Sequence, residues 1–157
     1  MVLMRVGYPA RADAVPVARK AATGCVRELG VEESLAQAVA LTVTEACTNV
    51  VLHAYREREE PGDMVVSIEK PDDFLRVTGF DNGVGMGPRP DSPGLGMGLA
   101  LISQFTDSLH LRSRLEGGAE VSMRFDLTPD PGLPSGPLQD QVEVSTPRYH
   151  RRASGAL

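Results

Sequence analysis

A segment that is apolar nearly all round spans residues 35–54, and Glu45 is its only formal charge. At about 100° per residue, a helix places polar side chains of this segment on one narrow stripe: Thr42, Glu45, Asn49 and His53. Because a helix that is apolar on its other faces is buried, its carboxylate needs a partner, a metal or a polar cavity. We therefore predict a buried helix over about residues 32–55 whose polar stripe faces a site.

Two plainer interpretations of this segment are an ordinary helix and a membrane span. A glutamate and an asparagine one turn apart are common on solvated helices, where such a pair is structural. A run of this length with one charge could also cross a bilayer, but polar residues interrupt it and it is rich in alanine, so we expect no membrane span. The choice between a structural and a functional stripe depends on the other motifs of the chain.

The remaining hydrophobic pattern predicts strands and helices on both sides of this segment. In chain order they are a strand over 1–6, a helix over 14–29 capped by Asp13, strands over 64–70 and 74–80, a glycine-rich loop over 83–98, a helix from Leu99, and strands over 108–114 and 119–127. This order favours an α+β fold, a two-layer α/β sandwich in which a mixed, mainly antiparallel sheet carries the helices on one face. We expect one domain over residues 1–127 and a disordered, Pro- and Gly-rich C-terminal tail over 128–157.

The composition narrows the class of protein. A chain of 157 residues with 24% charged and 41% hydrophobic residues is long enough for one soluble domain with its own core. The net charge of −5 argues against nucleic acid as the main partner. Cys25 and Cys47 lack the spacing of a zinc site or a redox pair, so we expect two free thiols in a reducing compartment. The apolar run over 1–6 is too short for a secretion signal, and we expect a cytoplasmic protein.

The loop over 83–98 contains six glycines and three prolines. Asp81-Asn82-Gly83-Val84-Gly85 follows a predicted strand, and Gly94-Leu95-Gly96-Met97-Gly98 precedes the helix that starts at Leu99. Glycines let backbone amides approach a ligand closely, and the free N–H groups at the start of a helix attract anions, most often phosphate. A P-loop would need Lys followed by Ser or Thr where Leu99-Ala100 stand, and the glycine spacing also differs from that of a Rossmann turn.

Three motifs in a fixed order carry a family resemblance: Glu45 and Asn49 on one buried helix, Asp81-x-Gly83-x-Gly85 after a strand, and Gly94-x-Gly96-x-Gly98 before a helix. Over about residues 30–127 the chain resembles the GHKL nucleotide-binding superfamily of gyrase, MutL and histidine kinases. The sequence of residues 44–55, together with the strand and helix that precede it, is similar to that of the anti-sigma factor serine kinases of bacterial partner-switching systems.

The resemblance implies ATP and Mg²⁺ as cofactors and assigns the chemistry to three side chains. Asn49 matches the magnesium ligand of the family. Glu45 matches the proposed general base, which takes the proton from an incoming serine hydroxyl or a water. Asp81 matches the aspartate that accepts a hydrogen bond from the adenine amino group.

The same resemblance implies an ATP-binding set, and it also shows two departures. The set is Asn49, His53, Asp81, Gly83, Gly85, Gly94, Leu95, Gly96, Met97, Gly98 and Leu99. Within it, His53 either touches the phosphates or bonds a neighbour, and the sequence leaves both open. Close relatives carry a threonine after the glycine that opens the last strand, where Gly118 is followed here by Ala119. The lid over 87–94 is also short.

The expected function is that of an ATP-dependent serine/threonine kinase and anti-sigma factor. Its expected partners are a STAS-type anti-anti-sigma protein, which it phosphorylates, and a sigma factor, and relatives of this kind commonly form homodimers. Two alternatives stay open. One is a binding module that holds ATP and a partner without phosphotransfer, and the other is a detached catalytic part of a histidine kinase.

Overall fold

A computed structural model describes residues 1–56, 59–85, 97–114, 117–127 and 142–145. Its elements in chain order are β1 (Val2–Pro9), a short 3-10 helix η1 (Ala12–Ala14), α1 (Val15–Arg27), α2 (Glu33–Asn49), a π-helical turn η2 (Val50–Ala54), β2 (Asp63–Glu69), β3 (Phe74–Asp81), α3 (Met97–Gln104), β4 (Ser108–Ser113), β5 (Ala119–Asp126) and β6 (Val142–Ser145).

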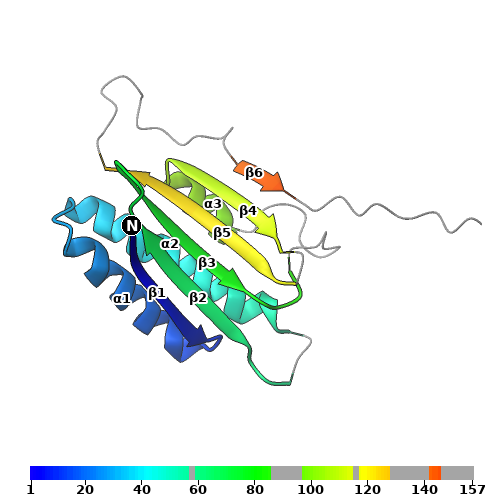
Figure 1. The fold of residues 1–157 in the computed structure, drawn as a ribbon. Helices are drawn as coiled ribbons and strands as arrows, with labels where there is room; N and C mark the ends of the chain where they lie inside the picture. Colours follow the sequence, from blue (N-terminus) through cyan, green and yellow to red (C-terminus); the bar gives the residue numbers. More distant parts are fainter. Residues whose placement is uncertain (57–58, 86–96, 115–116, 128–141, 146–157) are drawn as a thin grey trace, which may run out of the picture.

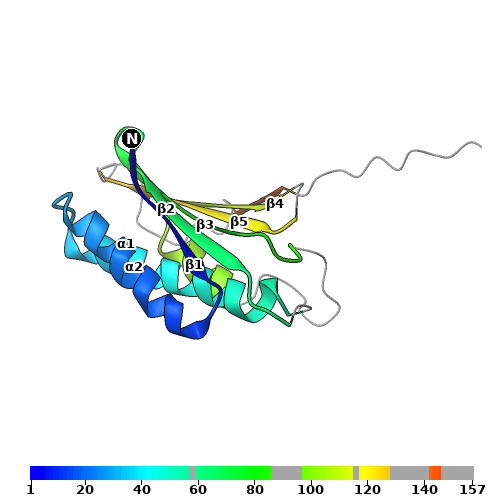
Figure 2. The same ribbon diagram turned by 60° about the horizontal axis from the view of Figure 1, so that its bottom comes forward.

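The six strands form one sheet in the order β1-β2-β3-β5-β4-β6. All neighbouring strands run antiparallel except β4 and β6, which are parallel. The three α-helices cover one face of this sheet and leave the other face open (Figures 1 and 2). The predicted α+β fold, with a mainly antiparallel sheet and helices on one face, is confirmed.

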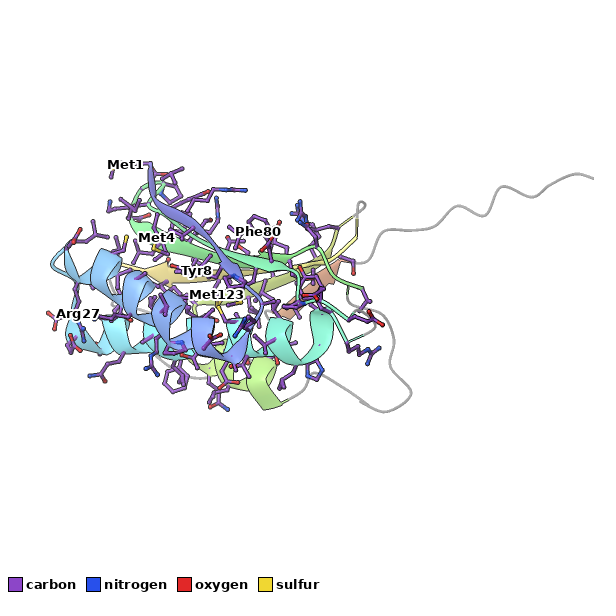
Figure 3. All side chains as sticks on the ribbon, turned by 90° about the horizontal axis from the view of Figure 1, so that it is seen from below. Met1, Met4, Tyr8, Arg27, Phe80 and Met123 are labelled. Carbon is purple, nitrogen blue, oxygen red and sulfur yellow. The ribbon has the colours of Figure 1, made fainter. Side chains whose placement is uncertain are left out.

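The core lies between the sheet and the helices, because apolar residues alternate along the strands. In β2, Met64, Val66 and Ile68 are nearly inaccessible to solvent, and Met123 and Phe125 of β5 extend the same buried face. Figure 3 shows Met123 between the sheet and the helices, and Phe80 on the open side of the sheet. The two faces of the sheet therefore have different environments, one apolar and one polar.

The predicted long helix is confirmed as α2 with its continuation η2. Val39 and Val43 are fully buried, and α2 packs between α1 and α3. Within the described part of the chain, the 22 residues of α2 and η2 are the one helix long and apolar enough to cross a membrane by length and composition. In this fold the apolar character of that helix serves the contact with the sheet and the two neighbouring helices.

Two local predictions at the start of the chain were wrong. The first strand continues beyond residue 6 through Gly7 to Pro9, because it pairs with β2 as far as Pro9 opposite Asp63. Asp13 does not cap α1, because the N-cap residue is Ala14. The carboxylate of Asp13 instead lies 3.3 Å from Nε of Arg11. The first difference comes from strand pairing, and the second from the 3-10 turn η1, which contains Asp13 and so places Ala14 at the start of α1.

The segment 142–145 lies in the tail that was expected to be disordered. It forms β6, with Leu109 of β4 opposite Val142 and Leu111 opposite Val144. The edge of β4 offers unpaired backbone groups to any extended segment that reaches it. Because such pairing uses backbone atoms, the composition of the tail did not reveal it.

Candidate functional site

Glu45 and Asn49 lie one turn apart on α2, half-buried, facing the start of α3. Gly98 of α3 is so close to them that a Cβ atom at this position would stand 2.8 Å from Oε2 of Glu45. The same Cβ would be 3.3 Å from Nδ2 and 3.4 Å from Oδ1 of Asn49. The structure therefore brings together a carboxylate, an amide and a backbone with no side chain, in a space that a methyl group would fill.

The first turn of α3 adds backbone donors to this junction. Met97 opens the helix, and Leu99, half-buried, packs against the main core. N–H groups in the first turn of a helix have no partner within the helix and carry a positive partial charge. Glu45 and Asn49 therefore lie beside a helix end that favours anions such as phosphate.

Asp81 ends β3 and is 4% exposed. Its Oδ1 accepts a hydrogen bond of 2.7 Å from the N–H of Gly83. Burial raises the pKa of the Asp81 carboxyl, while hydrogen bonds from the amides of Gly83 and Ala119 and the charge of Arg114 act against that rise. The result is a buried carboxyl held in place by backbone donors, which is suited to recognising a hydrogen-bond donor on a ligand.

Gly83 joins this aspartate to the helix that carries Glu45. A Cβ atom at Gly83 would lie 2.1 Å from the carbonyl oxygen of Ala54, so any side chain would push the loop off the end of η2. The N–H of Val84 donates to the same carbonyl at 2.9 Å. Gly85 follows with φ +76°. The loop after β3 is thus attached directly to the last turn of the long helix.

His53 lies in the π-helical turn and is half-buried. A π turn holds more residues than an α turn, so the 100° spacing that placed His53 on the stripe of Glu45 and Asn49 does not hold at this point. Such turns occur frequently at functional sites. That His53 contacts either the phosphates or a neighbouring residue stays a prediction.

The predicted lid over 87–94 lies outside the described residues. The second glycine motif is only partly described. Its last two residues, Met97 and Gly98, belong to α3, whereas Gly94, Leu95 and Gly96 lie outside the described residues. The contact of this motif with the site is therefore described at Gly98, which lies close to Glu45.

Tyr55 supports the site and was given no role from the sequence. Its side chain is buried at the end of the long helix, and its hydroxyl donates to the carbonyl of Asp63 at 2.5 Å. The same hydroxyl accepts a hydrogen bond of 3.1 Å from the N–H of Asn82. Tyr55 follows a segment that is predicted to be buried, and a buried tyrosine usually has a hydrogen-bond partner for its hydroxyl. The sequence could have indicated Tyr55 in this way.

Arg114 is a second residue that the sequence did not indicate. Its Nη1 donates to Oδ1 of Asn82 at 2.8 Å and lies 3.4 Å from the carbonyl oxygen of Asp81. Its position next to the loop after β3 depends on how β4 pairs with β5, and no local pattern around residue 114 shows that pairing.

The chemistry of these residues fits magnesium bound together with a nucleotide. In the described residues there is no group of three or more His, Cys, Asp or Glu side chains that could hold a metal ion. Magnesium that accompanies nucleotides takes only one or two protein oxygens and completes its shell with phosphates and water. The amide oxygen of Asn49, open toward Gly98, is an oxygen of this kind.

Comparisons with known proteins identify the family of the chain. A family model described as a histidine kinase-like ATPase domain matches residues 8–125. The chain is 35% identical to the anti-sigma F factor of Pasteuria penetrans over 92 residues, 52% of this chain and 61% of that protein, so it spans about three fifths of that relative's length. It is 27% identical over 118 residues to the serine-protein kinase RsbW of Bacillus cereus strain B4264, covering 66% of this chain and 72% of that protein.

The fold has a counterpart among solved structures. The structure of the RsbU and RsbW domains of Rv1364c from Mycobacterium tuberculosis superposes with a TM-score of 0.61 and 17% identity, over 79% of this chain and 31% of that chain. At this identity the match shows a common fold. With the family model covering most of the chain, the predicted resemblance is confirmed, and the chain belongs to the histidine kinase-like ATPase domain family.

Proposed function

We propose that this protein is an ATP- and magnesium-dependent serine/threonine kinase that phosphorylates a STAS-type anti-anti-sigma protein and acts as an anti-sigma factor in the cytoplasm. The observation that carries the proposal is the close approach of Gly98 to both Glu45 and Asn49. The names of the relatives, an anti-sigma F factor and a serine-protein kinase, support the same class of activity.

In the proposed reaction ATP would supply the phosphoryl group and leave as ADP. The side-chain oxygen of Asn49 would hold Mg²⁺, which would offset the negative charge of the phosphates. Glu45 orients the attacking serine or threonine hydroxyl and accepts its proton. Asp81 selects adenine by accepting a hydrogen bond, and the buried position of its carboxyl excludes water from that contact. The N–H groups at the start of α3 bind phosphate oxygens.

The test is transfer of labelled phosphate from ATP to a cognate STAS-type protein. Glu45→Gln keeps the shape of the side chain and removes its basicity, and we expect the rate to fall by about 10² or more, as is typical when a general base is lost. Glu28→Gln on the exposed end of α1 is the matched control and should leave the rate unchanged. Transfer by Glu45→Gln at the wild-type rate would rule out this base.

A second candidate is a nucleotide-dependent binding module without phosphotransfer. It is favoured by Ala119, because the hydrogen bond from residue 119 to Asp81 comes from the backbone amide and alanine has no hydroxyl to add a second. Binding of ATP and of the STAS-type protein, with no phosphoprotein detected by mass spectrometry after prolonged incubation, would establish this candidate and exclude the kinase.

A further inference from the structure

The open face of the sheet, opposite the helices, contains a polar hollow of about 640 Å³. Its floor consists of short hydroxyl side chains that the strand register places in one row, Ser67 opposite Thr78 and Thr78 opposite Ser122. The same row ends in Arg5 on β1 and His110 on β4. A face of this kind presents small hydrogen-bonding groups below longer charged ones.

An aromatic ring holds two of the surrounding arginines in place. The guanidinium carbons of Arg5 and Arg114 both lie 5.0 Å from the centroid of the Phe80 ring. Figure 3 shows Phe80 on this side of the sheet, away from the helices. Stacking on a ring restricts a guanidinium without using its N–H donors, so the donors of Arg5 stay available to a carboxylate.

The charge of the hollow opposes that of the whole chain. Its lining contains four arginines, Arg5, Arg76, Arg112 and Arg114, against Glu69 and Glu120. Arg76 is already paired with Glu69 at 3.4 Å, whereas neither Arg5 nor Arg112 lies within ion-pair distance of a carboxylate of a described residue. A chain of net charge −5 thus carries a local excess of positive charge on one concave face.

We propose that this open face binds an extended, acidic segment of a partner protein. Arginines pair with carboxylates through two parallel hydrogen bonds, and the half-buried hydroxyls of Thr78 and Ser122 can bond the backbone of a peptide lying across the strands. Glu69 and Glu120 would repel the continuous phosphate charge of a nucleic acid, which favours a peptide of mixed composition. The proposal concerns a surface separate from Glu45 and Asn49 and does not depend on kinase activity.

This surface is also connected to the nucleotide side of the molecule. Arg114 stacks on Phe80 in the hollow, and the same guanidinium bonds Asn82 in the loop after Asp81. Arg114 is therefore left unchanged in the test, so that a loss of partner binding cannot arise from a disturbed nucleotide loop.

The test uses a fluorescein-labelled peptide of about twelve residues, long enough to cross the sheet, with alternating glutamate and serine. Its affinity for the full chain is measured by fluorescence anisotropy at physiological ionic strength. We expect the double variant Arg5→Gln/Arg112→Gln to weaken binding by about tenfold or more, since both unpaired arginines are lost. Arg19→Gln/Lys20→Gln, on the exposed side of α1, removes the same charge elsewhere and should leave the affinity unchanged.

Equal weakening in both double variants would overturn the proposal, because it would show attraction to overall charge alone. So would peptide binding that Arg5→Gln/Arg112→Gln leaves intact, or no binding to the wild type. Tighter binding of a DNA duplex of matched charge would identify a nucleic-acid surface, and loss of self-association in the variant, by analytical ultracentrifugation, would identify a second copy as the occupant. Hydrogen exchange on the wild type provides a readout without substitution, with protection expected in β1, β3 and β4 rather than in α1.

Discussion

Gly98 stands against the carboxylate of Glu45, since a Cβ at residue 98 would approach Oε2 to 2.8 Å. We therefore predict that Gly98→Ala displaces this carboxylate and lowers phosphotransfer by at least about tenfold, a change of about 1.4 kcal/mol in activation free energy. Because the displaced atom ends a flexible side chain and alanine favours helices, the free energy of unfolding should be unchanged or higher by up to about 1 kcal/mol.

The matched control for this prediction is Gly24→Ala in α1. A Cβ added there meets nothing within 4 Å, so the same substitution should leave phosphotransfer unchanged. Kinase assays and urea denaturation of both variants separate the two effects. Full activity in Gly98→Ala would mean that the position of the Glu45 carboxylate does not matter to the reaction.

Asn49→Ala should remove the protein oxygen assigned to magnesium. We predict that ATP affinity measured by calorimetry in excess Mg²⁺ falls by about tenfold or more, equivalent to about 1.4 kcal/mol. With EDTA present, the variant and the wild type should differ much less. Gln37→Ala, which removes an exposed amide from the same helix, is the control. An equal loss with and without magnesium would assign Asn49 a direct contact with the nucleotide instead.

The main elements of the fold could be predicted because their signals are local. The segment 35–54 is apolar enough to require burial, and the alternation in β2 and β5 marks the face that packs on it. The order of the motifs also predicts that Glu45, Asp81 and Gly98 share one site, and the structure brings Gly98 against Glu45.

What could not be predicted depends on contacts between distant segments. The hydrogen bonds of Tyr55 to Asp63 and Asn82 form only when the helix end, β2 and the loop after β3 meet. The bond from the Ala119 amide to Asp81 likewise arises from the pairing of β3 with β5. Periodicity describes one element at a time, and it also assumes an α-helix at His53, where the structure has a π turn.

Tyr55→Phe tests how much the bridge between the helix end and the nucleotide loop contributes. The variant leaves the N–H of Asn82 and the carbonyl of Asp63 without the hydroxyl, and we predict a loss of about 1–2 kcal/mol in the free energy of unfolding by urea. Tyr8→Phe in β1 removes the hydroxyl of a half-buried tyrosine, which bonds no described residue, and it should change stability by less than about 0.5 kcal/mol. Equal stability of the two variants would contradict a structural role for the bridge.

The two free cysteines should differ in reactivity. Burial raises the pKa of Cys47 to about 12, so the reactive thiolate is scarce at pH 8. Cys25 is only half-buried, although burial and Glu28 raise its pKa as well. With a chromogenic disulfide reagent we predict one thiol titrated in the native protein and a second after denaturation in urea. Cys25→Ser should abolish the native reaction, and a remaining fast native thiol would contradict the burial of Cys47.

Asp81→Asn tests whether the buried aspartate serves binding at the expense of stability. Burial raises the pKa of Asp81 in the folded protein above its ordinary value of 3.8, so folding favours the protonated form. Below pH 3.8 this group is protonated in both states, and its ionised form destabilises the fold progressively as the pH rises through its raised folded pKa. The unfolding free energy of Asp81→Asn minus that of the wild type should therefore increase with pH over this window and then level off. Urea denaturation across the acidic range measures this difference, in which the contributions of the other carboxyl groups cancel.

The same variant should bind ATP at least about tenfold more weakly, because its amide places a donor where adenine also donates. A difference in unfolding free energy that falls as the pH rises would mean that the hydrogen bonds to Asp81 outweigh its burial.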